Sequence, residues 1–413
     1  MKSIILLALL SATSLHAEFP SPLDPLSNAQ LKPARRHEPR PQRLRTPSGP
    51  AKFGDPLIGL NKAQTDAFTT GLDEFTNVED AAGGLGPIFN NSSCISCHGV
   101  PAAGGSSTLT VTRFGHASSY FDPLTELGGS LLQSEALDPE LQEVVPPEAN
   151  LIALRQSTPL FGLGLIEAIP DAAILQLANR PKRDGIAGKA AIVTDLASGK
   201  QRVGRFGWKS QVATLLTFSA DAYQNEMGIT NRFFPTENSP NGDDDKLALW
   251  DKVQDPEDEV DPLTGRSDID IVADFMRLLA PPPTLPLTPS AQIGSVLFQQ
   301  IGCAVCHTPM LQTGRNAIPA LNLKPVALYS DLLLHDMGAL GDGIAQGDAA
   351  PREMRTAPLW GLRASAPYLH DGRAPTIDGA IRVHQGEGSN PRDRYLRLSA
   401  PQRRQLLDFL GSI

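Results

Sequence analysis

All four cysteines of the chain lie in two pentapeptides of the same form. These are Cys94-Ile-Ser-Cys97-His98 and Cys303-Ala-Val-Cys306-His307. Each pentapeptide places two thiols one helical turn apart and follows the second thiol directly with an imidazole. Two such thiols can add to the two vinyl groups of a haem, and the imidazole then reaches the iron. The motifs therefore predict two covalently bound haem c groups, with the cysteines as thioethers and His98 and His307 as iron ligands.

Three other uses of the cysteine pairs compete with this prediction. A structural zinc site uses four cysteines, but the two pairs lie far apart in the sequence and each carries the same extra histidine. A thioredoxin-like redox pair needs a βαβ context that neither flank shows. Two disulfides would suit an exported protein. Absorbance of the purified protein separates these uses, because only covalent di-haem binding predicts haem bands.

The first residues have the features of a secretory signal peptide. Residues 1–17 combine Lys2, an apolar run from Ile4 to Leu10 and small residues ending at Ala17. The apolar run is shorter than the about 20 residues that cross a bilayer, and no later stretch is long and apolar enough. We therefore expect cleavage of the signal, export to the periplasm and no membrane span in the mature form.

The composition predicts a loop-rich globular chain without a nucleic-acid partner. The chain has 36 Lys and Arg against 45 Asp and Glu, a net charge of −9, whereas nucleic-acid binding needs a basic surface. Its 413 residues suit two to three domains. The 36 glycines and 36 prolines follow no repeat period and indicate many loops.

The order of motifs predicts four segments. Residues 1–17 form the signal peptide, and residues 18–57, rich in Pro and Arg, are expected to be an extended and poorly ordered leader. An N-terminal haem c domain with a large insertion is expected over 58–283, and a C-terminal haem c domain over 284–413. The boundary is placed at Pro281-Pro282-Pro283 because a run of prolines ends a helix.

Helical spacing of apolar residues precedes both pentapeptides. A helix is expected from Thr65, with Phe68, Leu72 and Phe75 on one face. A second begins after the N-cap Thr288, and its apolar positions are Ile293, Val296, Leu297 and Ile301. Further helices are expected over 269–279 and from Ser399, the last packing on the second haem module. The predicted fold is mainly α, with two cytochrome c-like haem domains, long loops and few short strands.

The segment 241–261 is strongly acidic, with nine Asp and Glu residues. Clustered hard oxygens suit Ca²⁺, but the segment lacks the spacing of an EF-hand loop. A solvated acidic loop is the competing interpretation.

Four further motifs show a family resemblance that covers residues 55–413. They are Arg205-Phe206-Gly207-Trp208-Lys209, His335-Asp336-Met337-Gly338, Thr356-Ala357-Pro358-Leu359-Trp360-Gly361-Leu362 and Tyr368-Leu369-His370-Asp371-Gly372-Arg373-Ala374. The sequence resembles the bacterial di-haem oxidoreductase family, often labelled thiol oxidoreductase. That family is related to the di-haem cytochrome c peroxidases and to the methylamine-utilisation di-haem enzyme.

The resemblance implies different ligands for the two irons. In the related peroxidases the C-terminal haem is usually six-coordinate and accepts electrons, and the position of its sixth ligand corresponds to His384 here. Met337 is the rival ligand. For the N-terminal haem, His116 lies near the position of a displaceable distal histidine. The resemblance also implies a propionate or loop-bracing role for His370, and a hydrogen-bonding role in a turn for His335.

Peroxide cleavage needs a general base that takes a proton from one oxygen and returns it to the other. The peroxidases use a glutamate directly before a methionine, about twenty residues after a tryptophan near the haems. The corresponding residues here are Glu226 and Trp208, although the glutamine that the peroxidases carry between them has no clear counterpart. Glu226 is therefore the first catalytic candidate, Trp208 a candidate electron relay, and Glu167 the second carboxylate candidate.

These features lead to one main hypothesis. The protein is expected to be a periplasmic di-haem c-type oxidoreductase, peroxidase-like, that passes electrons from a small cytochrome or copper protein through one haem to peroxide or another substrate at the other. A non-catalytic di-haem electron-transfer protein is the alternative. Thiol oxidation rests on the family label alone, since no cysteine is left free, and modification of another protein is suggested only by the methylamine-utilisation relative.

Overall fold

The computed structural model describes residues 51–413. The described residues belong to a single compact unit that begins at Gly49. The predicted signal peptide over 1–17 lies outside the described residues. Among the helices of the described region, none has the length and apolar character needed to cross a membrane.

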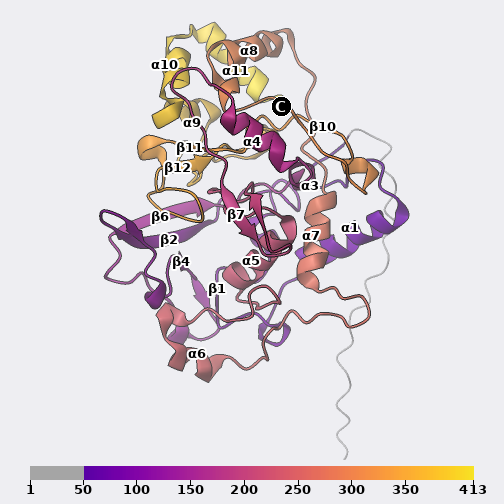
Figure 1. Cartoon of the computed structure of the whole chain (residues 1–413), viewed down its shortest axis with the longest axis vertical. Coiled ribbons are helices and arrows are strands. Elements are labelled where there is room, and N and C mark those ends of the chain that lie inside the picture. Colours follow the sequence, from indigo (N-terminus) through magenta and orange to yellow (C-terminus); the bar gives the residue numbers. More distant parts are fainter. Residues whose placement is uncertain (1–50) are drawn as a thin grey trace, which may run out of the picture. The chain divides into compact units, whose positions relative to one another are not determined.

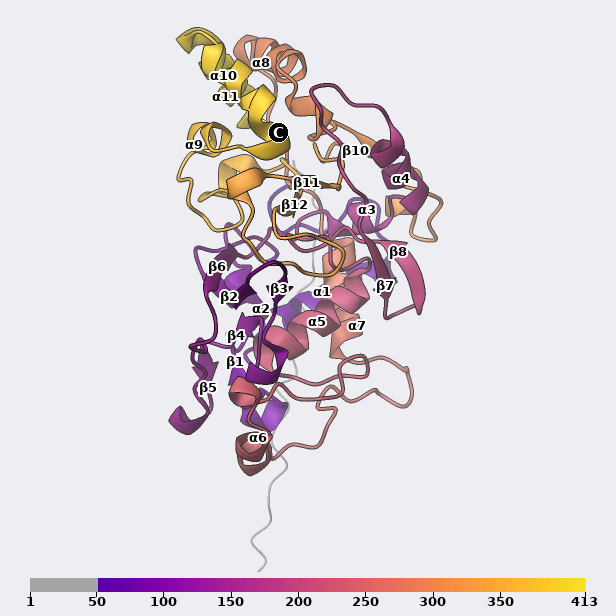
Figure 2. The same cartoon turned by 60° about the vertical axis from the view of Figure 1, so that its left-hand side comes forward.

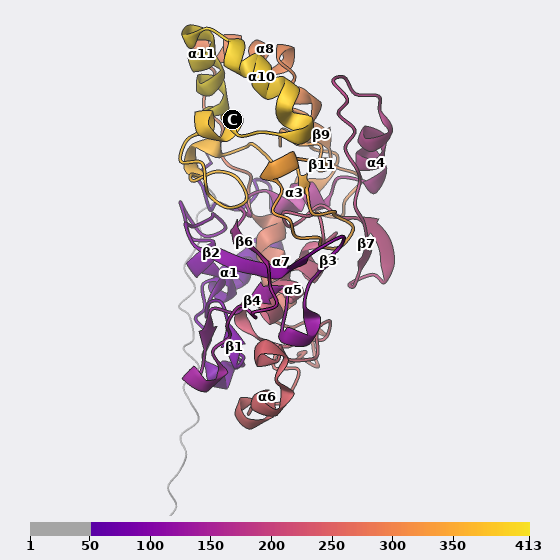
Figure 3. The same ribbon diagram turned by 90° about the vertical axis from the view of Figure 1, so that its left-hand side faces the viewer.

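Eleven α-helices lie in the described region (Figure 1). They are α1 (Lys62–Phe75), α2 (Cys94–Cys97), α3 (Leu163–Glu167), α4 (Asp171–Asn179), α5 (Leu215–Met227), α6 (Asp244–Trp250), α7 (Asp268–Leu278), α8 (Pro289–Gln300), α9 (Ile377–Arg382), α10 (Ser389–Arg397) and α11 (Ala400–Leu410). In Figures 2 and 3, α8, α10 and α11 lie together, and α1, α5 and α7 form a second group near the strands β2 and β6.

Twelve strands accompany these helices, so the prediction of a mainly α fold is wrong and the fold is mixed. They are β1 (Ile88–Phe89), β2 (Thr110–Ala117), β3 (Phe121–Asp122), β4 (Leu131–Leu132), β5 (Glu135–Ala136), β6 (Leu151–Gln156), β7 (Ile192–Asp195), β8 (Lys200–Val203), β9 (Leu311–Gln312), β10 (Pro325–Val326), β11 (Leu334–Asp336) and β12 (Glu353–Arg355). Most are short, as predicted.

The strand β2 is the main departure from the predicted fold. It pairs antiparallel with β3, β4 and β6, and its register with β6 runs from Thr110 opposite Gln156 to Gly115 opposite Leu151. Alternating β-branched and polar residues favour a half-buried strand over a helix. This sheet carries Arg113 on β2 and Gln156 at the end of β6.

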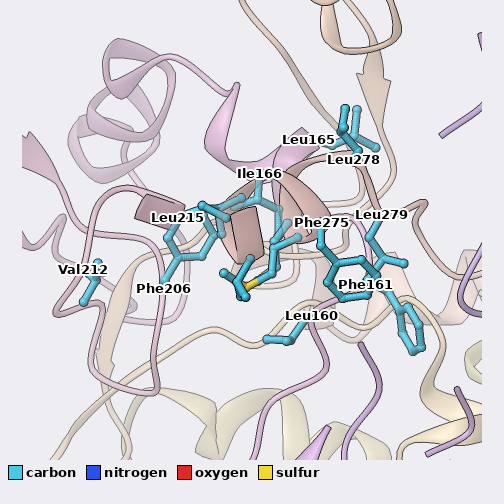
Figure 4. Close-up of a cluster of buried hydrophobic side chains, with 14 of the residues drawn as sticks. Leu160, Phe161, Leu165, Ile166, Phe206, Val212, Leu215, Phe275, Leu278 and Leu279 are labelled. Atoms are coloured by element: carbon cyan, nitrogen blue, oxygen red, sulfur yellow. The ribbon is translucent and has the colours of Figure 1, made fainter. Parts of the chain in front are cut away.

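The predicted helix around Phe68 and Phe75 is confirmed as α1. Asn61 caps its first turn in a reciprocal capping box with Gln64, so the helix begins before Thr65. Phe275 of α7 packs against both phenylalanines, with ring centroids 5.3 Å from Phe68 and 4.7 Å from Phe75. Figure 4 shows the adjoining apolar cluster, in which α3, α5 and α7 contribute side chains to one core.

The predicted helices at the second pentapeptide are confirmed, but their packing differs. Thr288 caps α8 as expected, and α11 packs on α8 with Phe298 and Phe409 rings 5.5 Å apart. The predicted apolar positions Ile293 and Val296 are instead about half exposed, whereas Gly294 is buried. The reason is that the small residue allows close helix contact: a Cβ on Gly294 would lie 1.9 Å from the carbonyl oxygen of Gln405.

Two predicted loops are better ordered than expected. The end of the Pro/Arg-rich leader, residues 51–57, belongs to the packed core, because Phe53 contacts Phe161 with ring centroids 5.3 Å apart and the Leu57 amide donates to Leu278 at 2.8 Å. The acidic segment contains α6, since Asp243 caps its first turn. The division into two haem domains at the proline run stays a prediction.

Candidate functional site

The second pentapeptide begins immediately after α8. Gly302 has φ +99°, a backbone conformation that glycine adopts without steric cost, and it turns the chain into the Cys303–Val305 turn. The amide of His307 donates to the carbonyl of Cys303 at 2.9 Å, which continues the turn. This geometry directs Cys303, Cys306 and His307 toward the same cavity.

That cavity has a volume of about 280 Å³. Cys303, Cys306 and His307 line it on the pentapeptide side, and His384 and Met337 also line it. Much of the remaining wall is aromatic, contributed by Phe206, Trp208, Phe218, Phe298, Trp360 and Tyr368. An apolar wall with a few nitrogen and sulfur donors is the usual chemistry of a cofactor pocket.

His307 and His384 present equivalent nitrogens to the cavity. The Nδ1 of His307 lies 3.1 Å from the carbonyl oxygen of Tyr329, and the Nδ1 of His384 lies 2.8 Å from that of Ala380. Because a carbonyl oxygen only accepts, each Nδ1 carries the proton and each Nε2 keeps a free lone pair. Burial lowers the pKa of His307 to about 4, helped by nearby His384, and burial also lowers the pKa of His384. Both rings are therefore neutral at pH 7, as iron ligation requires.

Met337 lies beside His384 on the same wall. A Cβ built on Gly388 would be 3.2 Å from the Cβ of His384 and 3.4 Å from the Cε of Met337. The two predicted rivals for the second iron are thus neighbours. His384 is the one whose ring is held by a backbone hydrogen bond.

The first pentapeptide forms α2 and continues into His98. The Nδ1 of His98 lies 3.2 Å from the carbonyl oxygen of Gly105, so this nitrogen carries the ring proton. Burial lowers the pKa of His98 to about 4, which keeps this ring neutral. Its ring centroid is 6.4 Å from that of Phe75, so α1 supports one side of the site.

A carboxylate and a guanidinium accompany the first pentapeptide. Glu226 lies near the end of α5 and accepts a hydrogen bond from the Asn90 side chain at 2.9 Å. Burial raises the pKa of Glu226, while Arg113 acts in the opposite direction. Burial raises the pKa of Cys97 to about 11, and the negative charge of Glu226 adds to this increase. The Glu226 carboxylate therefore lies near the Cys97 thiol. The Nε of Arg113 is buried and has no hydrogen-bond partner.

Trp208 connects the neighbourhood of the first pentapeptide with the cavity of the second. Its Nε1 donates to the carbonyl of Gln156 at 2.8 Å, and the next residue, Ser157, donates through its hydroxyl to the carbonyl of Cys97 at 2.5 Å. The indole also lines the cavity and contacts His370 edge to face, with ring centroids 6.3 Å apart.

Residues 132–413 match the model of a family described as "Di-haem oxidoreductase, putative peroxidase". The chain belongs to this family. The matched region is more than half of the chain and contains Trp208, Glu226 and the second pentapeptide, whereas the first pentapeptide precedes it.

Individual relatives of this di-haem oxidoreductase are distant. Cytochrome c peroxidase Ccp of Escherichia coli (strain K12) is 26% identical over 130 residues, which are 29% of this chain and 27% of that protein. The chain therefore spans about a quarter of the length of this curated relative. Among solved structures, the diheme peroxidase BthA from Burkholderia thailandensis E264 is 14% identical, with a TM-score of 0.39, and the match covers 84% of this chain and 85% of that one. Hydrazine synthase from Kuenenia stuttgartiensis is 13% identical, with a TM-score of 0.38 and coverage of 90% and 98%.

The donor set fits haem better than it fits the other uses of the cysteines. All four thiols are free, so neither pair forms a disulfide. Burial raises the pKa of Cys94 and Cys303 to about 12, unlike the acidic thiols of redox dithiols. Within residues 51–413, the two pairs are not brought together into a zinc site. The Nε2 atoms of His307 and His384 and the buried, unpartnered Nε of Arg113 fit the iron ligands and the anion contact that a haem site would need.

Two predicted residues of the di-haem oxidoreductase have other contacts. His116 lies on β2 with its Nδ1 2.8 Å from the carbonyl oxygen of Glu148, and strand alternation places it on the face opposite Arg113. Glu167 lies at the end of α3, where Arg277 donates to it at 2.7 Å and the Leu215 amide donates at 2.8 Å. The structure therefore does not bring either residue together with Glu226 and Arg113.

The environment of His335 differs from the expected turn. His335 lies on β11 and is buried, with its Nε2 3.1 Å from Asp331 and its Nδ1 2.5 Å from Glu387. Burial disfavours the charged ring, but the hydrogen bonds to Asp331, Cys306 and Glu387 outweigh it and raise the pKa of His335 to about 12. His335 is thus a charged partner of two carboxylates beside Cys306. His370 is also buried, and its contact with Trp208 suits the predicted bracing role.

The contribution of Gln156 to the site has no signal in the sequence. Its backbone carbonyl accepts from Trp208, its side-chain Nε2 donates to the carbonyl of Ser107 at 2.7 Å, and its side-chain oxygen is buried without a hydrogen-bond partner. The place of Gln156 opposite Thr110 in the β2–β6 ladder brings it there. Only a correct strand prediction would have shown this placement.

Proposed function

We propose that the protein is an exported di-haem c-type peroxidase that takes electrons from a small redox protein and reduces hydrogen peroxide. The observation that carries the proposal is the asymmetry of the two pentapeptide sites. The second has two neutral imidazoles, His307 and His384, at one cavity. The first has His98 together with a carboxylate and a guanidinium. Such a difference suits one site for electron entry and one for peroxide.

The proposed attachment uses the two pentapeptides alike. Cys94 and Cys97 would hold one haem in the N-terminal haem domain, and Cys303 and Cys306 would hold the other in the C-terminal haem domain. All four cysteines would form thioethers. When bound, the two haems supply electron transfer and the iron at which peroxide is reduced. His384 is proposed as the sixth ligand of the second iron because its Nε2 is free and its ring is fixed by the Ala380 carbonyl.

Glu226 is proposed as the general base and acid. Reduction of peroxide consumes two electrons and two protons and forms two waters. The carboxylate of Glu226 would take the proton from one peroxide oxygen and return it to the other, which leaves as water. Its raised pKa makes it a stronger base than a solvated glutamate, and the Asn90 amide orients it. Arg113, with its unpartnered buried Nε, would stabilise negative charge that develops on oxygen.

Steady-state peroxide consumption by the holoprotein tests the proposal. The protein is supplied with a reduced small cytochrome, and the spectra of both haems are followed during turnover. We expect peroxide-dependent oxidation of the cytochrome and a high-spin, peroxide-reactive iron in at least one redox state. If both irons remain six-coordinate in every redox state and no peroxide is consumed, the protein is an electron carrier and the proposal is wrong.

A further inference from the structure

The insertion between α5 and α7 brings four carboxylates together, away from both pentapeptides in the sequence. They are Glu237, Asp251, Asp255 and Glu257. One oxygen from each side chain lies within 4.8 Å of one oxygen from each of the others. Three of the four belong to the acidic segment 241–261, and Glu237 joins them from outside it.

Glu237 is the unusual member of this carboxylate cluster. Its side chain is buried, with the residue only 7% exposed, and neither of its carboxylate oxygens has a hydrogen-bond partner. Burial raises the pKa of Glu237 to about 10, and Glu257, Asp255 and Asp251 all add to this increase. A buried carboxylate without a donor is costly unless a cation or a proton compensates it.

Neighbouring groups hold the other carboxylates in place without neutralising them. The hydroxyl of Thr230 donates to Asp255 at 3.0 Å and also contacts Glu257, and its amide donates to Glu257 at 2.7 Å. In the described region, no Lys or Arg forms an ion pair with the cluster. Arg232 pairs with Asp270 and Lys246 with Asp243, while Lys252 exerts only a weak favourable effect on Asp251.

We propose that Glu237, Asp251, Asp255 and Glu257 bind one calcium ion that stabilises the insertion between α5 and α7. Calcium takes six to eight oxygen ligands in flexible geometry, and four carboxylates can provide up to eight. Magnesium demands a stricter octahedron and retains its waters, so it fits four converging carboxylates less well. The proposal does not depend on haem or on peroxidase activity.

Without the ion, Glu237 holds a proton at neutral pH, because its pKa is raised to about 10. Calcium binding must therefore release that proton. This can be measured with the haem-loaded protein, freed of calcium by a chelator, in calorimetric titrations with calcium chloride in two buffers of different ionisation enthalpy. We expect one calcium per chain and release of about one proton at pH 7.

Matched variants locate the ion. We expect Glu237→Gln and Asp255→Asn each to weaken calcium binding by about 10-fold or more, whereas the exposed neighbour Asp245→Asn leaves it unchanged. In chelator, Glu237→Gln should leave the thermal midpoint of unfolding nearly unchanged at neutral pH, because the protonated Glu237 that it replaces is already neutral. The proposal is wrong if the unchanged protein binds no calcium, or if both cluster variants bind calcium as tightly as it does.

Discussion

Burial of the Glu226 carboxyl favours its protonated form, and this determines how the proposed catalytic base should respond to pH. Its raised pKa means that the ionised fraction falls at a higher pH than for a solvated glutamate. A base must be ionised to accept a proton, so peroxide turnover should decline on acidification at a pH above the ordinary range of glutamate. We expect Glu226→Gln to slow turnover by about 10²-fold or more at neutral pH. Stopped-flow measurement of peroxide consumption checks this, with haem content as the control.

Glu167 provides the matched comparison for Glu226. Its carboxylate already binds Arg277 at 2.7 Å and the Leu215 amide at 2.8 Å. Glu167→Gln should therefore lower the free energy of unfolding by about 1 kcal/mol and leave peroxide turnover nearly unchanged. If instead Glu167→Gln abolishes turnover and Glu226→Gln does not, the assignment of the base is wrong.

His384 and Met337 are neighbours on one wall, so single substitutions must separate them. We expect His384→Gly to convert the second haem from low spin to high spin, because the free Nε2 of His384 is its proposed sixth ligand. Met337→Leu should leave the spin state unchanged. Electron paramagnetic resonance of the oxidised protein measures both. A spin change only in the methionine variant would assign the ligand to Met337.

At the scale of elements, the contact between α8 and α11 depends on the absence of one side chain. A Cβ on Gly294 would lie 1.9 Å from the carbonyl oxygen of Gln405, and backbone cannot give way there without separating the helices. We expect Gly294→Ala to lower the free energy of unfolding by about 1–3 kcal/mol. The exposed Gln292→Ala on the same helix should change it little. Chemical denaturation of both variants measures their free energies of unfolding. Equal values for the two variants would contradict the observed packing of α8 on α11.

At the scale of the whole molecule, Trp208 is the side chain that links the two pentapeptide sites. It bonds to Gln156, which precedes the Ser157 partner of Cys97, and it lines the cavity that contains His307. We expect Trp208→Leu to slow electron transfer between the two haems by about 10-fold or more, with both haems still attached. Flash reduction of one haem and observation of the other measures this rate. An unchanged rate would remove Trp208 from the electron path.

Local patterns were sufficient to predict several helices and to propose the two haem motifs. The pentapeptides are contiguous, so their chemistry can be recognised without a fold, and α1, α7, α8 and α11 are helices because caps and apolar spacing act within a few turns. The same patterns could not predict the pairing of β2 with β6, because Thr110 and Gln156 are distant in the sequence and pair only in the folded chain.

The arrangement of the site depends on contacts between residues that are distant in sequence. A short resemblance indicates Glu226, but its hydrogen bond with Asn90 and the proximity of Arg113 depend on the packing of α5, β1 and β2. Likewise, the acidic segment 241–261 by itself indicates a solvated loop. Only the folded chain brings the buried Glu237 next to its carboxylates. Burial, hydrogen bonding and the proximity of like charges set the proton affinity of such groups, and all three are properties of the folded chain.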